Sequence, residues 1–262
     1  MDSGGEADGI RVSEPVVVRE QPEPGVAVLR LNRPAVLNAL SNAVMTSLGD
    51  ALDEFAGDGR TRAVIITGDA RAFAAGADVA EFAAEGPNIE AWDRLWACPL
   101  PLVAAVRGLA LGGGLELAMS CDLLVVAEDA RLGQPEINLG IMPGAGGTQR
   151  LTRAVGKTLA TEMVLLGREL SGRDAEAHGL ANRCVPSERV LPAALELARA
   201  LARQAPEAVR AAKRAIAQAY EQSLHAALLD ERRAFMALLA SPDGREGVAA
   251  FLEKRRPVWR KP

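Results

Sequence analysis

A change of pattern near residue 155 constrains the fold of this chain more than any other feature. Before it, short apolar runs typical of buried strands alternate with segments of helical periodicity; from about residue 157 the pattern is almost entirely helical. The clearest strand-like runs are Ala63–Thr67, Leu102–Val106 and Leu123–Ala127. Strands that alternate with helices are typical of α/β proteins, in which helices cover a sheet. We therefore predict an α/β core with a helical C-terminal extension.

The N-terminal part predicts a disordered tail, a hairpin and a capped helix. Residues 1–13 begin acidic and rich in Gly, which is typical of disorder. Two β-rich runs, Pro15–Arg19 and Val26–Leu31, flank a turn at residues 21–25 that is rich in Pro. Ser41 is placed to cap a helix whose apolar residues recur every three or four positions.

Charge and cysteine usage exclude several classes of protein. The balance of 30 Lys and Arg against 34 Asp and Glu gives a net charge of −4, which argues against a nucleic-acid partner. Cys98, Cys121 and Cys184 have no metal-ligand spacing, which argues against a zinc site or a disulfide scaffold. The longest apolar run, Ala97–Val106, is too short for a membrane span and contains two prolines. With no signal peptide in the pattern, we expect a cytoplasmic protein without metal.

Several familiar catalytic motifs fail. The run Gly156–Thr158 ends like a P-loop, but Leu151 stands where the first Gly of that loop belongs. No GxSxG elbow is present, and His178 and His225 are the chain's two histidines, which supplies a serine hydrolase triad poorly.

Two Gly-rich turns, Phe73–Asp78 and Leu111–Glu116, each come before a predicted helix. Glycine lets a backbone approach a ligand closely, and the start of a helix offers unpaired N–H groups. Two such loops side by side can direct two N–H donors at one developing oxyanion. The pattern alone favours the simpler alternative, in which each is a tight turn with a helix cap.

Two carboxylates stand close to these glycines in the sequence. Glu116 lies in an otherwise apolar helical segment, and Glu136 follows Gly133–Pro135. A carboxylate in apolar surroundings costs free energy unless it is paired or protonated, so both residues are functional candidates; helix capping or a salt bridge is the alternative for each. The segment Gly140–Gly147 is too rich in Gly for a plain helix, and we predict that it shapes a pocket.

Taken in order, these motifs resemble the enoyl-CoA hydratases of the crotonase superfamily. The resemblance extends from about Val16 to Arg256. It rests on Leu31–Pro34 with Leu37–Leu40, Phe73–Asp78, Gly112–Asp122, Gly133–Glu136, Pro143–Thr152 and Phe251–Arg255. It implies a crotonase-like spiral of ββα units over residues 14–200 and a helical trimerisation region over residues 201–262.

The resemblance also implies the site. The backbone N–H groups of Ala77 and Gly113 would form an oxyanion hole for the thioester carbonyl of an acyl-CoA, and Glu116 and Glu136 would be the catalytic carboxylates. The implied substrate-binding positions are Ala75, Asp78, Gly144, Phe251 and Lys254. A neighbouring subunit of a homotrimer or hexamer would contribute the last two, beside the acyl chain and the CoA nucleotide.

The expected reaction is the addition of water to a 2-enoyl-CoA, with no cofactor because CoA is part of the substrate. Glu136 would deliver a proton to the α-carbon while Glu116 activates water, and two adjacent carboxylates suit such an acid/base pair. The setting would be fatty-acid β-oxidation or a more specialised pathway, and Trp92 and Trp96 are candidates to line the acyl pocket.

Two departures from the family pattern concern CoA binding. Ala35 and Val36 stand where a basic residue often follows Asn-Arg-Pro, and Val79–Glu81 replace another basic position. We expect Arg33, Lys254 or nearby arginines to compensate. Two alternatives stay open: an isomerase or other acyl-CoA lyase on the same scaffold, and a binding or RNA-binding relative without catalysis.

Overall fold

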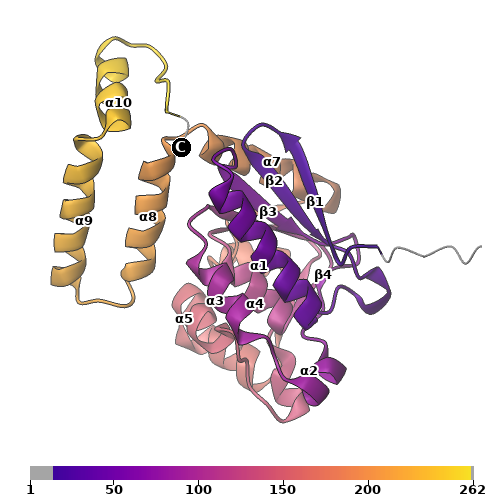
Figure 1. The fold of residues 1–262 in the computed structure, drawn as a ribbon. Helices are drawn as coiled ribbons and strands as arrows, with labels where there is room; N and C mark the ends of the chain where they lie inside the picture. Colours follow the sequence, from indigo (N-terminus) through magenta and orange to yellow (C-terminus); the bar gives the residue numbers. More distant parts are fainter. Residues whose placement is uncertain (1–13, 261–262) are drawn as a thin grey trace, which may run out of the picture.

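A computed structural model describes residues 14–260, so the tail predicted for residues 1–13 lies outside the described part of the chain. The strands form two sheets (Figure 1). The larger sheet has, in spatial order, β1 (Val17–Glu23), β2 (Val26–Leu31), β3 (Ala63–Thr67), β5 (Leu102–Val106), β7 (Leu123–Ala127) and β10 (Arg183–Val185). The smaller sheet has β4 (Ala72–Ala74), β6 (Leu109–Leu111), β8 (Arg131–Gly133) and β9 (Glu169–Ser171).

The chain winds as a spiral of ββα units. The units that begin at β3, β5 and β7 each send one strand through the larger sheet, one through the smaller sheet, and then form a helix, whereas β1 and β2 both lie in the larger sheet. Equivalent strands of successive units pair in parallel, as Val103 does with Leu123 and Leu109 with Arg131. The helices that follow the units are α2 (Val79–Glu85), α3 (Ile89–Ala97), α4 (Gly113–Ser120), the 3-10 helix η2 (Pro135–Leu139) and α5 (Gly147–Leu165). The helices that directly follow β4, β6 and β8, which are α2, α4 and η2, therefore begin at the same end of the smaller sheet.

The core includes the buried apolar side chains of the first helix, β3 and β5. The first helix, α1 (Asn42–Gly57), begins where predicted, because the Ser41 hydroxyl accepts a hydrogen bond from Val44 N at 3.2 Å. Its apolar stripe, which includes Leu48 and Leu52, is buried. The strands β3 and β5 are buried along their whole length, and α7 (Val190–Ala202) covers them. The remaining short elements are η1 (Pro34–Val36), α6 (Gly172–Ala177) and η3 (Ser187–Arg189).

Two details of the predicted pattern are wrong. The region after residue 157 is not almost entirely helical, because β9 and β10 each complete the edge of a sheet. Strands of three residues are too short to give a period that sequence reading can detect. The first hairpin turns at Pro24 and Gly25, not from residue 21, since β1 continues through Pro22 to Glu23. Pro22 sits at a register irregularity on an edge strand, where a missing N–H donor is tolerated.

The last three helices form a C-terminal arm that stands apart from the rest of the chain (Figure 1). They are α8 (Pro206–Gln218), α9 (Leu224–Leu239) and α10 (Pro242–Leu252). Large apolar side chains of α9 are exposed in the single chain: Leu224 is 76% exposed and Phe235 is 58% exposed. The arm thus begins close to the predicted boundary at residue 201, and its role in trimerisation stays a prediction.

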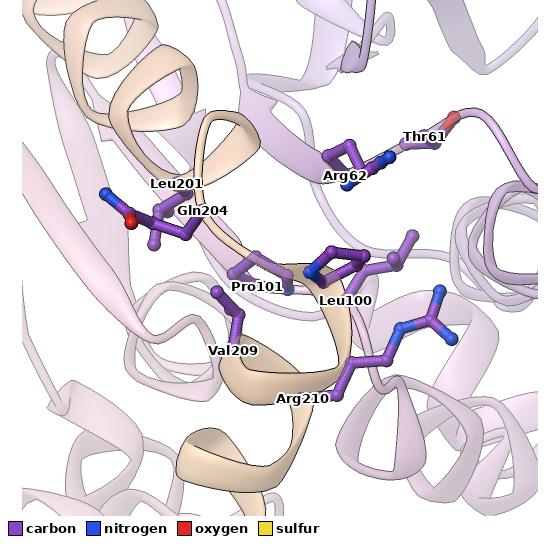
Figure 2. A pocket seen from close by; sticks show the side chains of 9 residues that line it. Thr61, Arg62, Leu100, Pro101, Leu201, Gln204, Val209 and Arg210 are labelled. Carbon is purple, nitrogen blue, oxygen red and sulfur yellow. The ribbon is translucent and has the colours of Figure 1, made fainter. Parts of the chain in front are cut away.

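Lys213 joins the arm to the core. Its Nζ donates to the Leu100 carbonyl oxygen at 2.7 Å and lies 2.8 Å from Asp122 Oδ2. Among residues 14–260 this is the one ion pair between α8–α10 and the preceding chain. Figure 2 views the same junction, where Leu100 and Pro101 meet Val209 of α8 around a cavity of about 10 Å³. A cavity of that size holds at most one water molecule, so it is no substrate site.

We expect Lys213→Met to lower the free energy of unfolding by about 1–3 kcal/mol, the usual cost of losing hydrogen bonds from a charged group. The variant leaves a half-buried carbonyl and carboxylate without their ammonium partner. Chemical denaturation followed by circular dichroism measures the change, with the exposed Lys157→Met as the matched control. Equal stabilities for the two variants would show that the ion pair does not hold the arm.

Candidate active site

The two Gly-rich loops lie side by side, as the oxyanion-hole hypothesis requires. The first is fixed by hydrogen bonds from Ala75 N to the Leu37 carbonyl oxygen at 3.0 Å and from Leu40 N to the Gly76 carbonyl oxygen at 2.8 Å. A Cβ atom built on Gly113 would lie 3.5 Å from Ala77 N, so the two loops touch at these residues. In the described part of the chain, neither Ala77 N–H nor Gly113 N–H has a protein acceptor.

Backbone geometry explains why this contact needs glycine. Gly112, which caps α4, has φ +51° and ψ −126°, a conformation that side chains disfavour. A Cβ atom on Gly114 would lie 2.0 Å from the Ala74 carbonyl oxygen at the end of β4. The glycines therefore allow α4 to begin directly against the other loop, and its first N–H groups stay free of intrahelical partners.

Glu116 is buried on α4, with 4% of its surface exposed. Its Oε1 accepts hydrogen bonds from Ala145 N at 2.7 Å and from Gly147 N at 2.8 Å, at the start of α5. Burial raises the pKa of this carboxyl group, although the two hydrogen bonds oppose the increase. The predicted Gly-rich segment thus forms a loop whose end holds Glu116.

Glu136 lies in η2 and faces the same region. A Cβ atom on Gly112 would be 3.0 Å from Glu136 Oε1, which places this carboxylate beside the oxyanion loop. Burial, together with the nearby charge of Glu116, raises the pKa of Glu136 to about 7. Neither glutamate forms an ion pair within residues 14–260, so the salt-bridge alternative is not borne out there.

Sequence reasoning missed Gln134, which is fully buried between these groups. One end of its side-chain amide lies 2.9 Å from Glu136 Oε1 and 3.2 Å from Oε2, and the other end lies 3.5 Å from the Gly112 carbonyl oxygen. With the NH2 group assigned to the first end, it donates to both carboxylate oxygens. The one signal in the sequence was its place directly before Pro135 and Glu136, which says nothing about where its side chain points.

Asp78 and Arg33 form a salt bridge with each other. Both terminal nitrogens of Arg33 donate to Asp78 Oδ2 at 3.0 Å, and Arg33 Nη1 also donates to the Ala39 carbonyl oxygen at 2.7 Å. The other Asp78 oxygen caps α2. Glu81, which stands at a position expected to be basic, accepts from Asn42 N at 3.0 Å. The Arg33 guanidinium, which we expected to compensate for a missing CoA-phosphate contact, is therefore already hydrogen-bonded within the protein.

The single chain does not bring the other predicted substrate-binding residues together. Gly144 is exposed near Glu116, with no atom within 4 Å of a Cβ built on it. Phe251 is 82% exposed on α10, and Lys254 follows that helix. In Figure 1, α10 lies at the opposite end of the molecule from α2 and the first Gly-rich loop. Contribution of Phe251 and Lys254 by a neighbouring subunit stays a prediction.

The two tryptophans of α3 differ in exposure. Trp92 is 6% exposed and Trp96 is 40% exposed, with ring centroids 6.1 Å apart. Trp96 Nε1 donates to the Ser120 hydroxyl at 3.0 Å, and the Arg150 guanidinium lies 5.5 Å from the Trp96 ring. These residues pack around the last turn of α4, one helical turn beyond Glu116.

The described residues contain neither a metal-binding group of side chains nor a membrane-spanning helix. No group of three or more His, Cys, Asp or Glu side chains between residues 14 and 260 is arranged to hold a metal ion. In the same range no helix is long and apolar enough to cross a membrane.

Comparison with known proteins identifies the class to which this fold and site belong. The family model described as enoyl-CoA hydratase/isomerase matches residues 21–262. The chain belongs to this family, and it is an enzyme of the hydro-lyase class. This result confirms the predicted resemblance.

The chain is similar to named relatives over nearly its whole length. It is 48% identical to the 2,3-dehydroadipyl-CoA hydratase of Escherichia coli (strain K12), over 95% of this chain and 99% of the relative. It is 43% identical to an enoyl-CoA hydratase of Geobacillus kaustophilus HTA426, with a TM-score of 0.88 over 94% of this chain and 98% of the other. An enoyl-CoA hydratase of Mycobacterium tuberculosis H37Rv superposes with a TM-score of 0.89 at 35% identity, over 95% and 100%. These structures confirm the crotonase-like fold.

Proposed function

We propose that this protein is an enoyl-CoA hydratase, which adds water across the 2,3 double bond of a 2-enoyl-CoA to give a 3-hydroxyacyl-CoA. The observation that carries the proposal is the pairing of two carboxylates, the buried Glu116 and the half-buried Glu136, with two free backbone donors. CoA enters as part of the substrate, and the residues named here need no cofactor for the reaction.

The proposed chemistry uses each group once. The N–H groups of Ala77 and Gly113 donate to the thioester oxygen, where negative charge develops as the enolate forms. Withdrawal of electrons toward that oxygen makes the β-carbon electrophilic. Glu116 takes a proton from water as the water oxygen bonds to the β-carbon, and Glu136 gives a proton to the α-carbon. The water has then contributed one hydroxyl group, and the net proton count of the pair is unchanged.

The presence of both glutamates favours hydration over the isomerase alternative. An isomerase moves one proton between two carbons and needs one carboxylate at the 136 position, whereas water addition uses a second group at the 116 position. The second alternative, a binding or RNA-binding relative, is disfavoured by the chain's net charge of −4. Assembly as a trimer or hexamer and a cytoplasmic location stay predictions.

A direct assay tests the proposal. Crotonyl-CoA is mixed with the protein, and loss of the conjugated-enoyl absorbance is followed while mass spectrometry identifies 3-hydroxybutyryl-CoA. The substrate panel includes longer 2-enoyl thioesters and 2,3-dehydroadipyl-CoA, for which the E. coli relative is named. Conversion of 3-enoyl to 2-enoyl thioesters without hydration would select the isomerase, and a salt-dependent RNA gel shift without turnover would select the RNA-binding alternative.

The pH dependence of the reaction is expected to be the same in both directions. Because the pKa of Glu136 in the free protein is raised to about 7, this group is protonated below that pH and can act as an acid. Hydration and dehydration each start from a pair of carboxyl groups that holds one proton, and the overall reaction releases none, so its equilibrium constant does not change with pH. Above about pH 7, kcat/KM should therefore fall by about tenfold per pH unit in both directions. Initial rates in both directions across this range measure the two profiles. A kcat/KM for hydration that does not fall above that pH would contradict the assignment of Glu136 as the acid.

A further inference from the structure

Gln134 is a buried polar group for which the reaction described above has no use. It follows β8 and precedes Pro135 at the start of η2, and none of its surface is exposed. Buried side-chain amides satisfy their hydrogen bonds within the protein, because an unsatisfied one costs free energy. The partners of this amide therefore indicate its role.

The first partner is Glu136. The Gln134 NH2 group reaches both carboxylate oxygens, at 2.9 Å and 3.2 Å. In the opposite orientation the amide nitrogen donates to the Gly112 carbonyl oxygen at 3.5 Å while the amide oxygen faces the two carboxylate oxygens. An ionised Glu136 therefore selects the orientation in which the NH2 group faces the carboxylate. When Glu136 takes up a proton, a half-turn of the amide lets its oxygen accept the new O–H. A neutral amide can thus hold Glu136 in both protonation states.

The second contact is with the segment that holds Glu116. A Cβ atom on Gly147 would lie 2.9 Å from Gln134 Cδ, so the Gln134 side chain packs directly on the Gly147 backbone. The N–H of Gly147 is one of the two donors to Glu116 Oε1, at 2.8 Å. One side chain therefore lies between Glu136 and a donor to Glu116.

The oxyanion loop is hydrogen-bonded to the segment that contains Gln134. Gly112 N donates to the carbonyl oxygen of Gly133, the residue before Gln134, at 2.9 Å. Gly113, the proposed oxyanion donor, follows Gly112 directly. The segment around Gln134 thus contacts all three parts of the site.

We propose that Gln134 is a positioning residue. Its amide fixes the Glu136 carboxylate, and its packing against Gly147 fixes the position of that carboxylate relative to Glu116. The role rests on the proposed hydratase function, because it is the proton transfer by Glu136 that requires a fixed carboxylate. Gln134 does not exchange a proton with the substrate. It acts by holding the group that does, and small errors in such placement reduce rates strongly.

The decisive variant is Gln134→Met, which keeps the length of the side chain and removes both hydrogen bonds. Glu136 is titrated in the free protein by NMR with glutamate labelled at the side-chain carboxyl carbon, and Glu136→Gln identifies its signal. A hydrogen bond to the ionised form favours that form, so its loss should raise the Glu136 midpoint by about one pH unit. Glu116, the charged group that acts on Glu136, is the same in both proteins.

Kinetics supply the second measurement. Gln134→Met should lower kcat for crotonyl-CoA by about 10–100-fold and change KM by less than about threefold, because the thioester contacts are untouched. Gln134→Glu, whose buried carboxyl group is protonated and can donate one hydrogen bond, should fall between wild type and Gln134→Met. The exposed Gln204→Met is the matched control and should retain the wild-type rate.

The outcomes separate this proposal from the proposed function. An unshifted Glu136 titration together with a wild-type kcat in Gln134→Met would overturn the positioning role. Because the titration needs no substrate, a shifted midpoint in a protein that hydrates no enoyl-CoA would refute the hydratase function and support the contact with Glu136. If Gln134→Met does not fold, Gln134→Glu decides: an unchanged titration and rate in that variant also overturn the proposal.

Discussion

We expect Glu136→Gln to lower kcat for the hydration of crotonyl-CoA by about a thousandfold, within the range of 10²–10⁴ that general acid catalysis supplies. The amide keeps the shape of the carboxyl group and cannot give a proton to the α-carbon. The thioester contacts do not involve Glu136, so KM should change little. Steady-state kinetics with crotonyl-CoA measures both constants.

Glu116→Gln is the matched variant at the other carboxylate. Its amide oxygen can still accept from Ala145 N and Gly147 N, so the loop before α5 should keep its conformation. We expect a comparable loss of kcat, because the water loses its base. The exposed Glu188→Gln, far from the Gly-rich loops in sequence, serves as the control for the loss of a surface charge. Robust turnover by both active-site variants would refute the two-carboxylate mechanism.

The same Glu136→Gln variant should be more stable than the wild type, and this gain should depend on pH. Because the pKa of Glu136 is raised from 4.5 to about 7, the folded protein binds this proton more tightly than the unfolded chain does. Wild type therefore loses stability as pH rises from about 4.5 to about 7, and the glutamine does not. Thermal unfolding should give a larger increase in Tm at about pH 8 than at about pH 5. A fall in Tm at both would indicate that the variant damages the fold.

A large loss of stability is expected from Gly114→Ala. The new Cβ would lie 2.0 Å from the Ala74 carbonyl oxygen and 2.8 Å from the Ala74 carbonyl carbon, so a backbone must move to accommodate it. Overpacking of a core usually costs about 1–3 kcal/mol, and contact with a rigid backbone places this variant at about 3 kcal/mol or above. Urea denaturation measures the loss.

Gly57→Ala at the end of α1 provides the control for that variant. Its Cβ would have no neighbour within 4 Å, so the change should leave stability equal or slightly higher, since alanine favours a helix over glycine. Gly114→Ala should also reduce kcat in whatever fraction folds, because separating α4 from β4 separates Gly113 from Ala77. A Gly114→Ala protein as stable as Gly57→Ala would contradict the close contact of the two loops.

The sequence predicted elements well where one pattern dominated the packing. Ala63–Thr67, Leu102–Val106 and Leu123–Ala127 are strands with the predicted bounds, because strands that are buried on both faces read as unbroken apolar runs. The strands β9 and β10 were not predicted, because three residues at the edge of a sheet carry little pattern of their own.

The candidate site divides in the same way. Glu116 and the Gly-rich loops were detectable because a charged residue in an apolar helix and clustered glycines are local anomalies. The roles of Gln134, Arg33 and Asp78 depend on contacts between segments that lie far apart in the sequence. For example, the Arg33–Asp78 pair spans 45 positions, and no local signal records it.

The proposed oxyanion donors are backbone N–H groups, and this has a consequence for how the family can change. Any residue except proline supplies an N–H, so in the proposed site the ability to polarise a thioester depends on the path of the main chain at residues 77 and 113, which the glycines at 112 and 114 make possible. The carboxylates, in contrast, are side chains that one mutation can remove or relocate. A chain with this spiral can therefore explore new reactions on the same thioesters by altering positions such as 116 and 136, while the grip on the carbonyl group is inherited unchanged.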